Sequence, residues 1–174
     1  NHADEVELFV NGESQGIRRK KVYGAAHEGA AWQHSTEYHV MWRVAFEPGE
    51  VKVVARKDGK QVGEQTIRTA GAPHHIVLKK TYQGTLAFGT SDPTTFVEVQ
   101  VVDKDGNLCP NADNQIFFSS DAKILGTDNG CQTSLERFTD PHRKAFFGKC
   151  VVVLKGKGTL TAKAVDLQQA QIQL

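Results

Sequence analysis

The chain has 174 residues, enough for one ordinary domain or two small ones. Lys and Arg number 21 and Asp and Glu number 20, a formal net charge of +1 that argues against a nucleic-acid-binding protein, which usually gathers a basic surplus on one face. Hydrophobic residues make up 39%, too many for a disordered chain. The longest aliphatic run, Val151–Leu154, is far too short to span a membrane. The length also excludes a (β/α)8 barrel, which needs roughly 250 residues.

The first residues of the chain show the alternation of a β-strand and not the pattern of a signal peptide. No initiator Met and no basic-then-apolar signal segment precede the alternating residues Glu5–Leu8. We therefore expect the chain to be cut out of a longer protein, so that the lack of a signal segment says nothing about localisation. The three cysteines, Cys109, Cys131 and Cys150, match no zinc spacing, and we interpret them as ordinary buried or half-exposed thiols.

Apolar side chains alternate with a period of two in successive segments along the chain. These segments are Val6–Val10, Val40–Phe46, Val51–Ala55, Val97–Val101, Leu160–Ala164 and Ile172–Leu174. Successive side chains of a strand point to opposite faces, so the pattern predicts half-buried antiparallel strands. No window of twelve residues carries a convincing helical stripe. The predicted fold class is all-β.

Residues rich in Gly, Asn and Asp lie between these segments. They are Asn11-Gly12, Glu47–Glu50, Lys57–Lys60, Asp103–Asn107 and Lys155–Gly158. Such residues tolerate the positive φ of tight hairpins, so we expect turns at each position.

One boundary divides the chain into two strand-rich halves. The segment Thr69–Pro73 consists of small residues and a proline, which suits a short semi-rigid linker. We predict two immunoglobulin-like β-sandwich modules in tandem, residues 1–70 and 74–174. The second has the length of a complete sandwich of about 100 residues. The first shows about five strands where roughly seven are usual, so we expect it to be truncated at its N-terminus.

No motif for catalysis or metal binding stands out. Asp103–Asn107 has the composition of a calcium loop, but Leu108 and Asn114 occupy the positions where an EF-hand needs Gly and Glu, and a hairpin turn explains the segment better. The seven histidines lack zinc spacing, and no Gly-x-Ser-x-Gly nucleophile motif occurs. We predict no catalytic residue, no metal site and no cofactor.

A polar loop over residues 125–136 is the best candidate for a functional contact. Its acceptors Asp128, Asn129 and Glu136 could touch a sugar or a neighbouring domain. The interpretation that we favour is a surface loop held by Asx-type turns.

Aromatic rings are the usual platforms for sugars. Trp32, in a Gly- and Ala-rich stretch, could be exposed and stack on a sugar, whereas Trp42 is in phase with Val40 and Val44 and is predicted to lie in a core. The basic run Arg18–Lys21 lacks interleaved aromatics and is interpreted as the solvated side of a hairpin strand.

Several segments resemble segments of a known protein family and occur in the same order along the chain. Asp4–Gly12, followed by Ser14 and Gly16, resembles the "VELFLNGKSLG" segment of the immunoglobulin-like modules in glycoside hydrolase family 2 β-galactosidases. Met41–Val44 with Glu47–Val51 is similar to the strands that follow in that module, and Arg68–Pro73 is similar to the linker into a last C-terminal module.

The second half is similar to the C-terminal module of the same family. The matching segments are Val102–Asn107, Ile124–Gly126, Asp128–Gly130, Arg143–Phe146 and Gly148–Cys150. The pattern departs after Asp128–Gly130, where relatives often continue with Asp-Pro and this chain has Cys131-Gln132.

The resemblance implies that catalysis and structural support reside in different domains of the parent protein. Family members are retaining β-glycosidases, which use two carboxyl groups about 5–5.5 Å apart. Both glutamates lie on an upstream (β/α)8 barrel, so this chain would be a non-catalytic C-terminal region that supports or flanks the barrel of the same polypeptide. The resemblance further implies an oligomer of the parent protein and a periplasmic or secreted bacterial location. The alternatives are a carbohydrate-binding module and a cell-surface adhesion-type immunoglobulin-like repeat.

Overall fold

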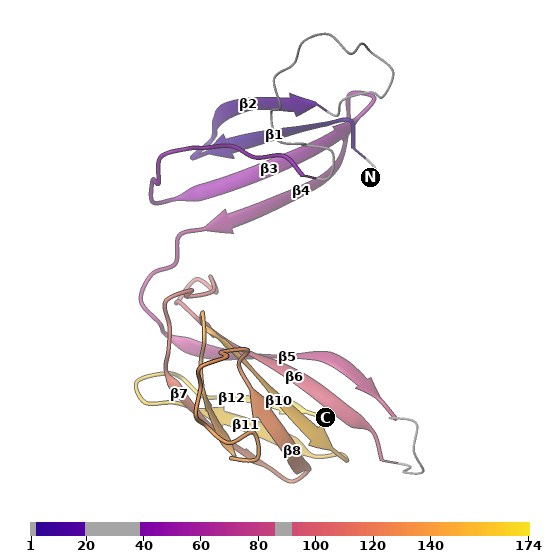
Figure 1. The fold of residues 1–174 in the computed structure, drawn as a ribbon, viewed down its shortest axis with the longest axis vertical. Helices are drawn as coiled ribbons and strands as arrows, with labels where there is room; N and C mark the ends of the chain where they lie inside the picture. The colour runs from indigo at the N-terminus through magenta and orange to yellow at the C-terminus, as the bar shows by residue number, and fades with distance from the viewer. Residues whose placement is uncertain (1–2, 20–38, 86–91) are drawn as a thin grey trace. The chain divides into compact units, whose positions relative to one another are not determined.

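The computed structural model describes residues 3–19, 39–85 and 92–174, which form antiparallel β-sheets and no helix. The all-β prediction is therefore confirmed. The chain divides into two compact units, residues 1–69 and 70–174 (Figure 1). None of the described segments is a helix long and apolar enough to cross a bilayer.

The described residues of the first unit form one antiparallel sheet in the order β2-β1-β3-β4. Its strands are β1 (Glu5–Val10), β2 (Glu13–Arg19), β3 (Glu50–Lys57) and β4 (Lys60–Arg68). Leu8 and Val10 are buried on one face, as their alternation predicts. Asn11 and Gly12 have φ values of 50° and 85°, which close the β1–β2 hairpin with the left-handed backbone of a type I′ turn. That this unit is a truncated sandwich stays a prediction.

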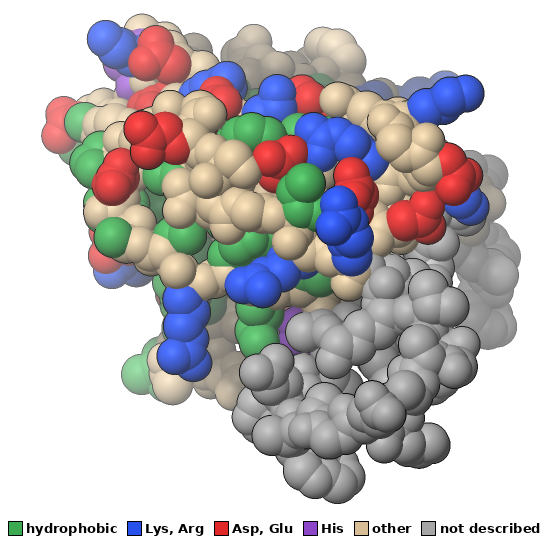
Figure 2. Space-filling view, turned by 90° about the horizontal axis from the view of Figure 1, so that it is seen from above, with side chains coloured by type: hydrophobic (Ala, Val, Ile, Leu, Met, Phe, Trp, Pro, Cys, Tyr) green, Lys and Arg blue, Asp and Glu red, His purple; other side chains and the backbone are tan. Residues whose placement is uncertain are grey.

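Charged side chains pair across the opposite face of this sheet. The pairs are Arg19–Glu5 at 3.0 Å, Arg56–Glu7 at 2.8 Å, Lys52–Glu64 at 3.3 Å and Arg68–Glu50 at 2.6 Å. Figure 2 likewise shows acidic and basic side chains interspersed rather than gathered by sign. Ion pairs near solvent contribute only about 0–1 kcal/mol each. This face is not wholly solvated, because Val54, which lies opposite Glu7 in the β1–β3 register, is buried on it.

The strand predicted over Val40–Phe46 is wrong. Residues 39–46 belong to no sheet ladder in the described part of the chain, and Phe46 is 81% exposed. Trp42, predicted as a core residue, is only half-buried and donates its indole N–H to the carbonyl of Gly16 at 3.2 Å. The segment therefore meets the edge strand β2 through a side chain, whereas a strand requires backbone pairing.

The second unit packs two four-stranded antiparallel sheets. One has the order β5-β6-β10-β8, with β5 (His75–Gly84), β6 (Thr94–Val102), β10 (Lys149–Lys155) and β8 (Lys123–Asp128). The other has the order β12-β11-β7-β9, with β12 (Ala170–Gln173), β11 (Thr159–Lys163), β7 (Gln115–Ser120) and β9 (His142–Lys144). This is the architecture of a β-sandwich.

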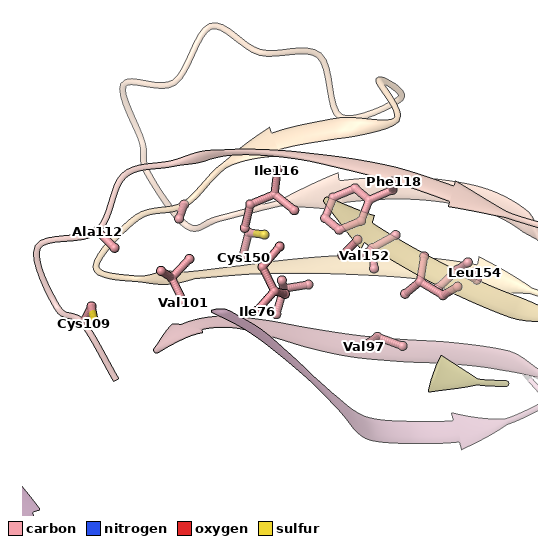
Figure 3. Packing of buried hydrophobic residues seen from close by; sticks show 14 of the residues in the cluster. Ile76, Val97, Val101, Cys109, Ala112, Ile116, Phe118, Cys150, Val152 and Leu154 are labelled. Atoms are coloured by element: carbon pink, nitrogen blue, oxygen red, sulfur yellow. The ribbon is translucent and has the colours of Figure 1, made fainter. Parts of the chain in front are cut away.

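The core of the second unit lies between these sheets (Figure 3). Val97 and Val99 of β6 and Leu154 of β10 contribute from one sheet, and Ile116 of β7 and Leu160 of β11 from the other; all five are fully buried. The valine alternation of β6 thus supplies one wall of the sandwich, as the sequence predicts.

The segment Lys155–Gly158 is not the tight hairpin that its glycines suggested. It connects β10 to β11, which lie in different sheets. Gly158 has a φ of +145°, and a Cβ there would come within 2.8 Å of the Cβ of Asp121. The glycine is needed because the chain crosses between sheets beside another loop.

The turn predicted at Asp103–Asn107 is confirmed, since Val102 and Leu108 on its two sides form an antiparallel bridge. The carboxylate of Asp103 is buried at its centre. It accepts hydrogen bonds from the amide of Gly71 at 2.8 Å, the amide of Asn107 at 2.8 Å and the side chain of Asn107 at 3.0 Å. These donors hold the pKa of Asp103 well below its usual range.

Candidate functional site

The prediction of a loop over residues 125–136 is wrong in its first part, because residues 125–128 are the end of strand β8, which pairs with β10. The candidate contact loop is therefore residues 129–141, between β8 and β9. These two strands are the edges of the two sheets of the sandwich, so residues 129–141 bridge the sheets along one side of the second unit. The amide of Thr127 donates to the carbonyl of Phe138 at 2.7 Å. The loop therefore covers backbone of the edge strand β8 that would otherwise remain open to pairing.

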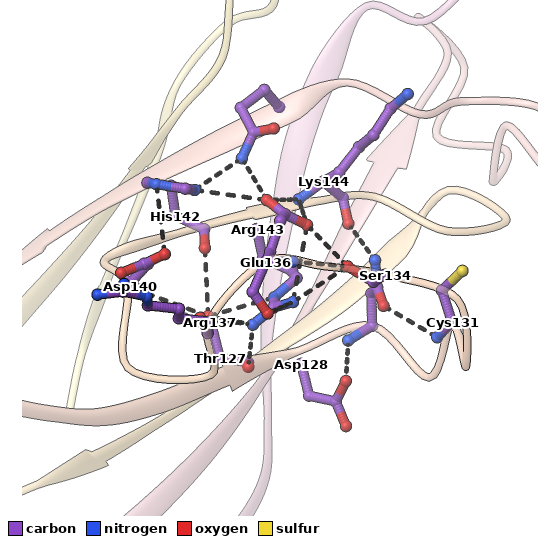
Figure 4. A network of polar contacts seen from close by, with 12 residues as sticks. Thr127, Asp128, Cys131, Ser134, Glu136, Arg137, Asp140, His142, Arg143 and Lys144 are labelled. Atoms are coloured by element: carbon purple, nitrogen blue, oxygen red, sulfur yellow. Dashed lines mark hydrogen bonds and ion pairs between the residues drawn. The ribbon is translucent and has the colours of Figure 1, made fainter.

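A buried arginine holds this loop in place (Figure 4). The side chain of Arg143 is 1% exposed. Its Nη2 donates to the carbonyl oxygens of Thr127 at 2.8 Å and Arg137 at 2.9 Å, and its Nη1 donates to the carbonyl of Glu136 at 3.3 Å. The ring of Phe138 lies 5.4 Å from the guanidinium carbon. A guanidinium has five donors in a fixed plane, so one side chain can fix several loop carbonyls at once.

Glu136 accompanies Arg143 as the loop's acidic partner. Its Oε2 lies 3.7 Å from Nη1 of Arg143, while Oε1 accepts from Gln115 at 2.8 Å. Both oxygens accept from the amide of Lys144 at 3.1 Å. Partial burial opposes ionisation, but the donors Gln115 and Lys144 and the charge of Arg143 outweigh it and lower the pKa of Glu136. Glu136 is thus an ionised acceptor rather than a proton donor.

Asp128 and Asn129 use their side chains on the loop's own backbone. Oδ1 of Asp128 accepts from the amides of Asn129 at 2.7 Å and Gly130 at 3.1 Å. Oδ1 of Asn129 accepts from the amide of Cys131 at 2.9 Å, and its Nδ2 donates to the carbonyl of Lys144 at 2.8 Å. These are Asx-type turns, which shape the loop.

The structure thus brings two of the predicted contact residues together, since Asn129 and Glu136 both bond the backbone of Lys144. Asp128 lies at the start of the same loop. Trp32 lies outside the described residues, so the structure does not place it. A contact of any of these residues with a sugar or another domain stays a prediction.

Sequence reasoning missed Arg143 as the centre of the loop. Arg143 and Ala145 are buried and Lys144 between them is exposed, as side chains alternate between the two faces of a strand. However, the alternation predicts only that neighbouring basic residues face opposite sides. Which side is the interior depends on the loop that covers it.

The described residues offer little for acid–base or metal chemistry. They contain no group of three or more His, Cys, Asp or Glu side chains placed to hold a metal ion. Wherever the pKa of a described carboxyl departs clearly from its ordinary value, it is lowered. These carboxyls are Glu7, Glu98, Asp103, Asp113 and Glu136. A general acid needs the opposite shift.

Residues 79–173 match a family described as glycoside hydrolase family 2 C-terminal domain 5. The chain belongs to glycoside hydrolase family 2. Residues 1–63 match a domain of unknown function, DUF4982. The family resemblance seen in the sequence is thereby confirmed.

Two curated relatives in this family are similar to the chain. It is 46% identical over 181 aligned residues to β-galactosidase BoGH2A of Bacteroides ovatus, covering 100% of this chain and 20% of that protein. It is 29% identical to a putative β-glucuronidase of Formosa agariphila, covering 88% of this chain and 14% of that protein.

Solved structures of family members share the fold. A β-glycosidase from Bacteroides vulgatus superposes with a TM-score of 0.80 at 31% identity, over 99% of this chain and 21% of that one. A family 2 glycosyl hydrolase from Bacteroides cellulosilyticus gives a TM-score of 0.77 at 27% identity. The chain therefore spans about a fifth of the length of such relatives and is a small C-terminal region of a β-galactosidase-like protein.

Proposed function

We propose that this chain is the non-catalytic β-sandwich region of a retaining β-galactoside hydrolase and supports a catalytic barrel elsewhere in the polypeptide. The observation that carries the proposal is the 46% identity, over the whole chain, to a β-galactosidase of which the chain makes up only 20%. The remaining four-fifths of such a protein is long enough to hold a barrel of about 250 residues.

The chemistry of the described residues supports a non-catalytic role. A retaining glycosidase needs one carboxyl group that stays protonated and a second that attacks the sugar. The raised pKa of the first depends on burial without strong hydrogen-bond donors. Glu136 and Asp103 are instead surrounded by donors that favour the ionised form.

The proposed substrate is a terminal β-galactoside. The relative called a β-galactosidase is more similar to this chain, at 46% identity, than the relative called a putative β-glucuronidase, at 29%. The experiment compares the full polypeptide on p-nitrophenyl β-galactoside and p-nitrophenyl β-glucuronide. We expect turnover of the galactoside; preferential turnover of the glucuronide would overturn the substrate assignment.

The same assay tests the non-catalytic role. We expect Asp128→Asn and Glu98→Gln to leave kcat on the preferred glycoside within about twofold, because loss of a group in the reacting machinery costs a factor of hundreds or more. A loss of that size in either variant, with the fold intact by circular dichroism, would contradict the proposal.

Two further properties of the parent protein belong to this proposal. We propose that it assembles into an oligomer; sedimentation of the full polypeptide measures this. We also propose that it acts in the periplasm or outside the cell, and fractionation of the producing bacterium measures this. The alternative function is a carbohydrate-binding module. Retention in a polysaccharide gel that Trp32→Ala abolishes would favour it and overturn the supporting role.

A further inference from the structure

The segment Thr69–Pro73 joins the two units, and its first residue is bound to the first unit. The amide of Thr69 donates to the carbonyl of Gly49 at 2.8 Å, and the hydroxyl oxygen of Thr69 accepts from the amide of Gly49 at 3.0 Å. Asn11 fixes the same turn, because its Oδ1 accepts from the amide of Glu50 at 2.8 Å. Thr69 is therefore held by a supported part of the first sheet.

Ala70 and Gly71 are bound to the second unit. Ala70 is half-buried and packs against the hydrophobic core of that unit. The amide of Gly71 donates to Oδ2 of Asp103 at 2.8 Å, and the carbonyl of Gly71 lies 3.6 Å from the thiol sulfur of Cys109, a weak donor. Asp103 and Cys109 are both buried. Gly71 is therefore held through its amide and through its carbonyl.

The residue that follows the segment is fixed in the same unit. The amide of His74 donates to the carbonyl of Val102 at 2.8 Å, and the carbonyl of His74 accepts from the amide of Gln168 at 3.0 Å. Two residues, one of them a proline with a fixed φ, lie between the bound residues Gly71 and His74. The segment beyond Thr69 is therefore tied to the second unit at both of its ends.

We propose that the junction between the units is a hinge at the single linkage from Thr69 to Ala70, and that Asp103 locks its second side. A domain linker of small residues and proline is usually exposed and flexible, whereas the contacts of this segment leave torsional freedom mainly at that linkage. Asp103 is the lock because one carboxylate serves both the junction and the adjoining turn. Its Oδ2 accepts from Gly71, while its Oδ1 accepts from two amides within the turn Asp103–Asn107, at 2.9 Å and 2.8 Å.

Limited proteolysis of the full polypeptide with elastase tests the hinge, because elastase cleaves after small residues such as Ala70 and Gly71. The wild type should resist cleavage at these two positions, since a protease needs backbone that has opened. Asp103→Asn should be cleaved there at least about tenfold faster. Its side chain can keep an oxygen on the amides of the turn, but it then presents to Gly71 an NH2 group, which cannot accept a hydrogen bond. Mass-spectrometric peptide mapping locates the cleaved bond.

Two control variants separate release of the junction from a general loss of stability. Asp105→Asn changes an exposed residue of the same turn that contributes its backbone amide rather than its carboxylate. Arg143→Met removes a buried side chain of the same unit whose hydrogen bonds hold the β8–β9 loop. Neither variant should be cleaved faster than the wild type after Ala70 or Gly71. Cleavage of the wild type as fast as that of Asp103→Asn, equal cleavage of Arg143→Met, or resistance of Asp103→Asn would overturn the proposal.

Discussion

At the scale of single residues, Arg143 decides how the β8–β9 loop is built. Among the largest fully buried side chains of the described residues, only that of Arg143 carries a charge. Removing it would leave the carbonyls of Thr127 and Arg137 without the donor that Arg143 supplies. The carboxylate of Glu136 would lose the guanidinium that lies 3.7 Å away. Buried groups that lose their partners are costly because water does not replace the lost bonds.

We therefore predict that Arg143→Met lowers the free energy of unfolding by about 2–4 kcal/mol. Arg137→Met is the matched control, because Arg137 is exposed on the same loop and contributes its backbone carbonyl rather than its side chain. Urea denaturation of both variants measures the difference. Losses of equal size would show that the loop does not depend on Arg143.

Asp103 gives the second unit a pH-dependent contribution to stability. Its folded pKa is lowered, first by the amide of Gly71 and then by the side chain of Asn107, while the unfolded pKa is about 3.9. A group whose folded pKa is depressed stabilises the fold above its unfolded pKa and loses this contribution as the pH falls through the folded pKa.

We predict that the thermal unfolding temperature falls as the pH drops below about 4 and that Asp103→Asn falls less steeply. At neutral pH the variant should unfold at a lower temperature, because an amide oxygen cannot replace both carboxylate oxygens. Differential scanning calorimetry from pH 7 to pH 2.5 provides the comparison. The same pH slope in both proteins would contradict the role of Asp103.

The three cysteines should differ in reactivity. Burial raises the pKa of the Cys150 thiol to about 12, and burial together with the charge of Asp103 raises that of Cys109. The hydroxyl of Thr133 lowers the pKa of Cys131. Since the thiolate is the reactive form, we predict that Cys131 reacts first with a thiol reagent in the native protein. Mass-spectrometric mapping of the label checks this, and Cys131→Ser should remove the fast phase; labelling at three equal rates would refute it.

At the scale of elements, the sequence predicts a strand best where one face of that strand packs against the hydrophobic core. The valines of β6 are fully buried as their spacing predicts, because both sheets of the second unit close over them. The same period at Val40–Phe46 failed, since alternation describes side chains and not the backbone partner that a strand needs. The site was less predictable still, because the position of Arg143 depends on a loop folded by tertiary contacts.

The β9–β10 turn carries local backbone strain. Phe147 and Gly148 have φ values of 50° and 74°, and Phe146 and Lys149 exchange backbone hydrogen bonds across them. Such a turn favours Asn followed by Gly, and Phe147 is 65% exposed, so its ring gains little burial in return.

We predict that Phe147→Asn raises the free energy of unfolding by about 0.5–1 kcal/mol. Phe147→Val should lower it, because a β-branched residue tolerates this backbone even less. Chemical denaturation of the two variants separates them. If Phe147→Asn were destabilising, the contact of its ring with Phe146, 4.4 Å away between centroids, would outweigh the strain.

At the scale of the whole molecule, the chain is a small C-terminal region of a β-galactosidase-like protein. It belongs to a glycoside hydrolase family and spans about a fifth of the length of its relatives. The polar side chains of the β8–β9 loop form hydrogen bonds within the chain (Figure 4). The same loop that sequence reasoning proposed as a polar contact presents leucine and phenylalanine outward.

The most direct test locates the nucleophile of the full polypeptide. A 2-deoxy-2-fluoro-β-galactoside with a good leaving group traps the covalent glycosyl-enzyme of a retaining glycosidase, and peptide mapping identifies the labelled carboxylate. Our account predicts a single labelled glutamate outside residues 1–174. A label on any aspartate or glutamate within these residues would contradict it.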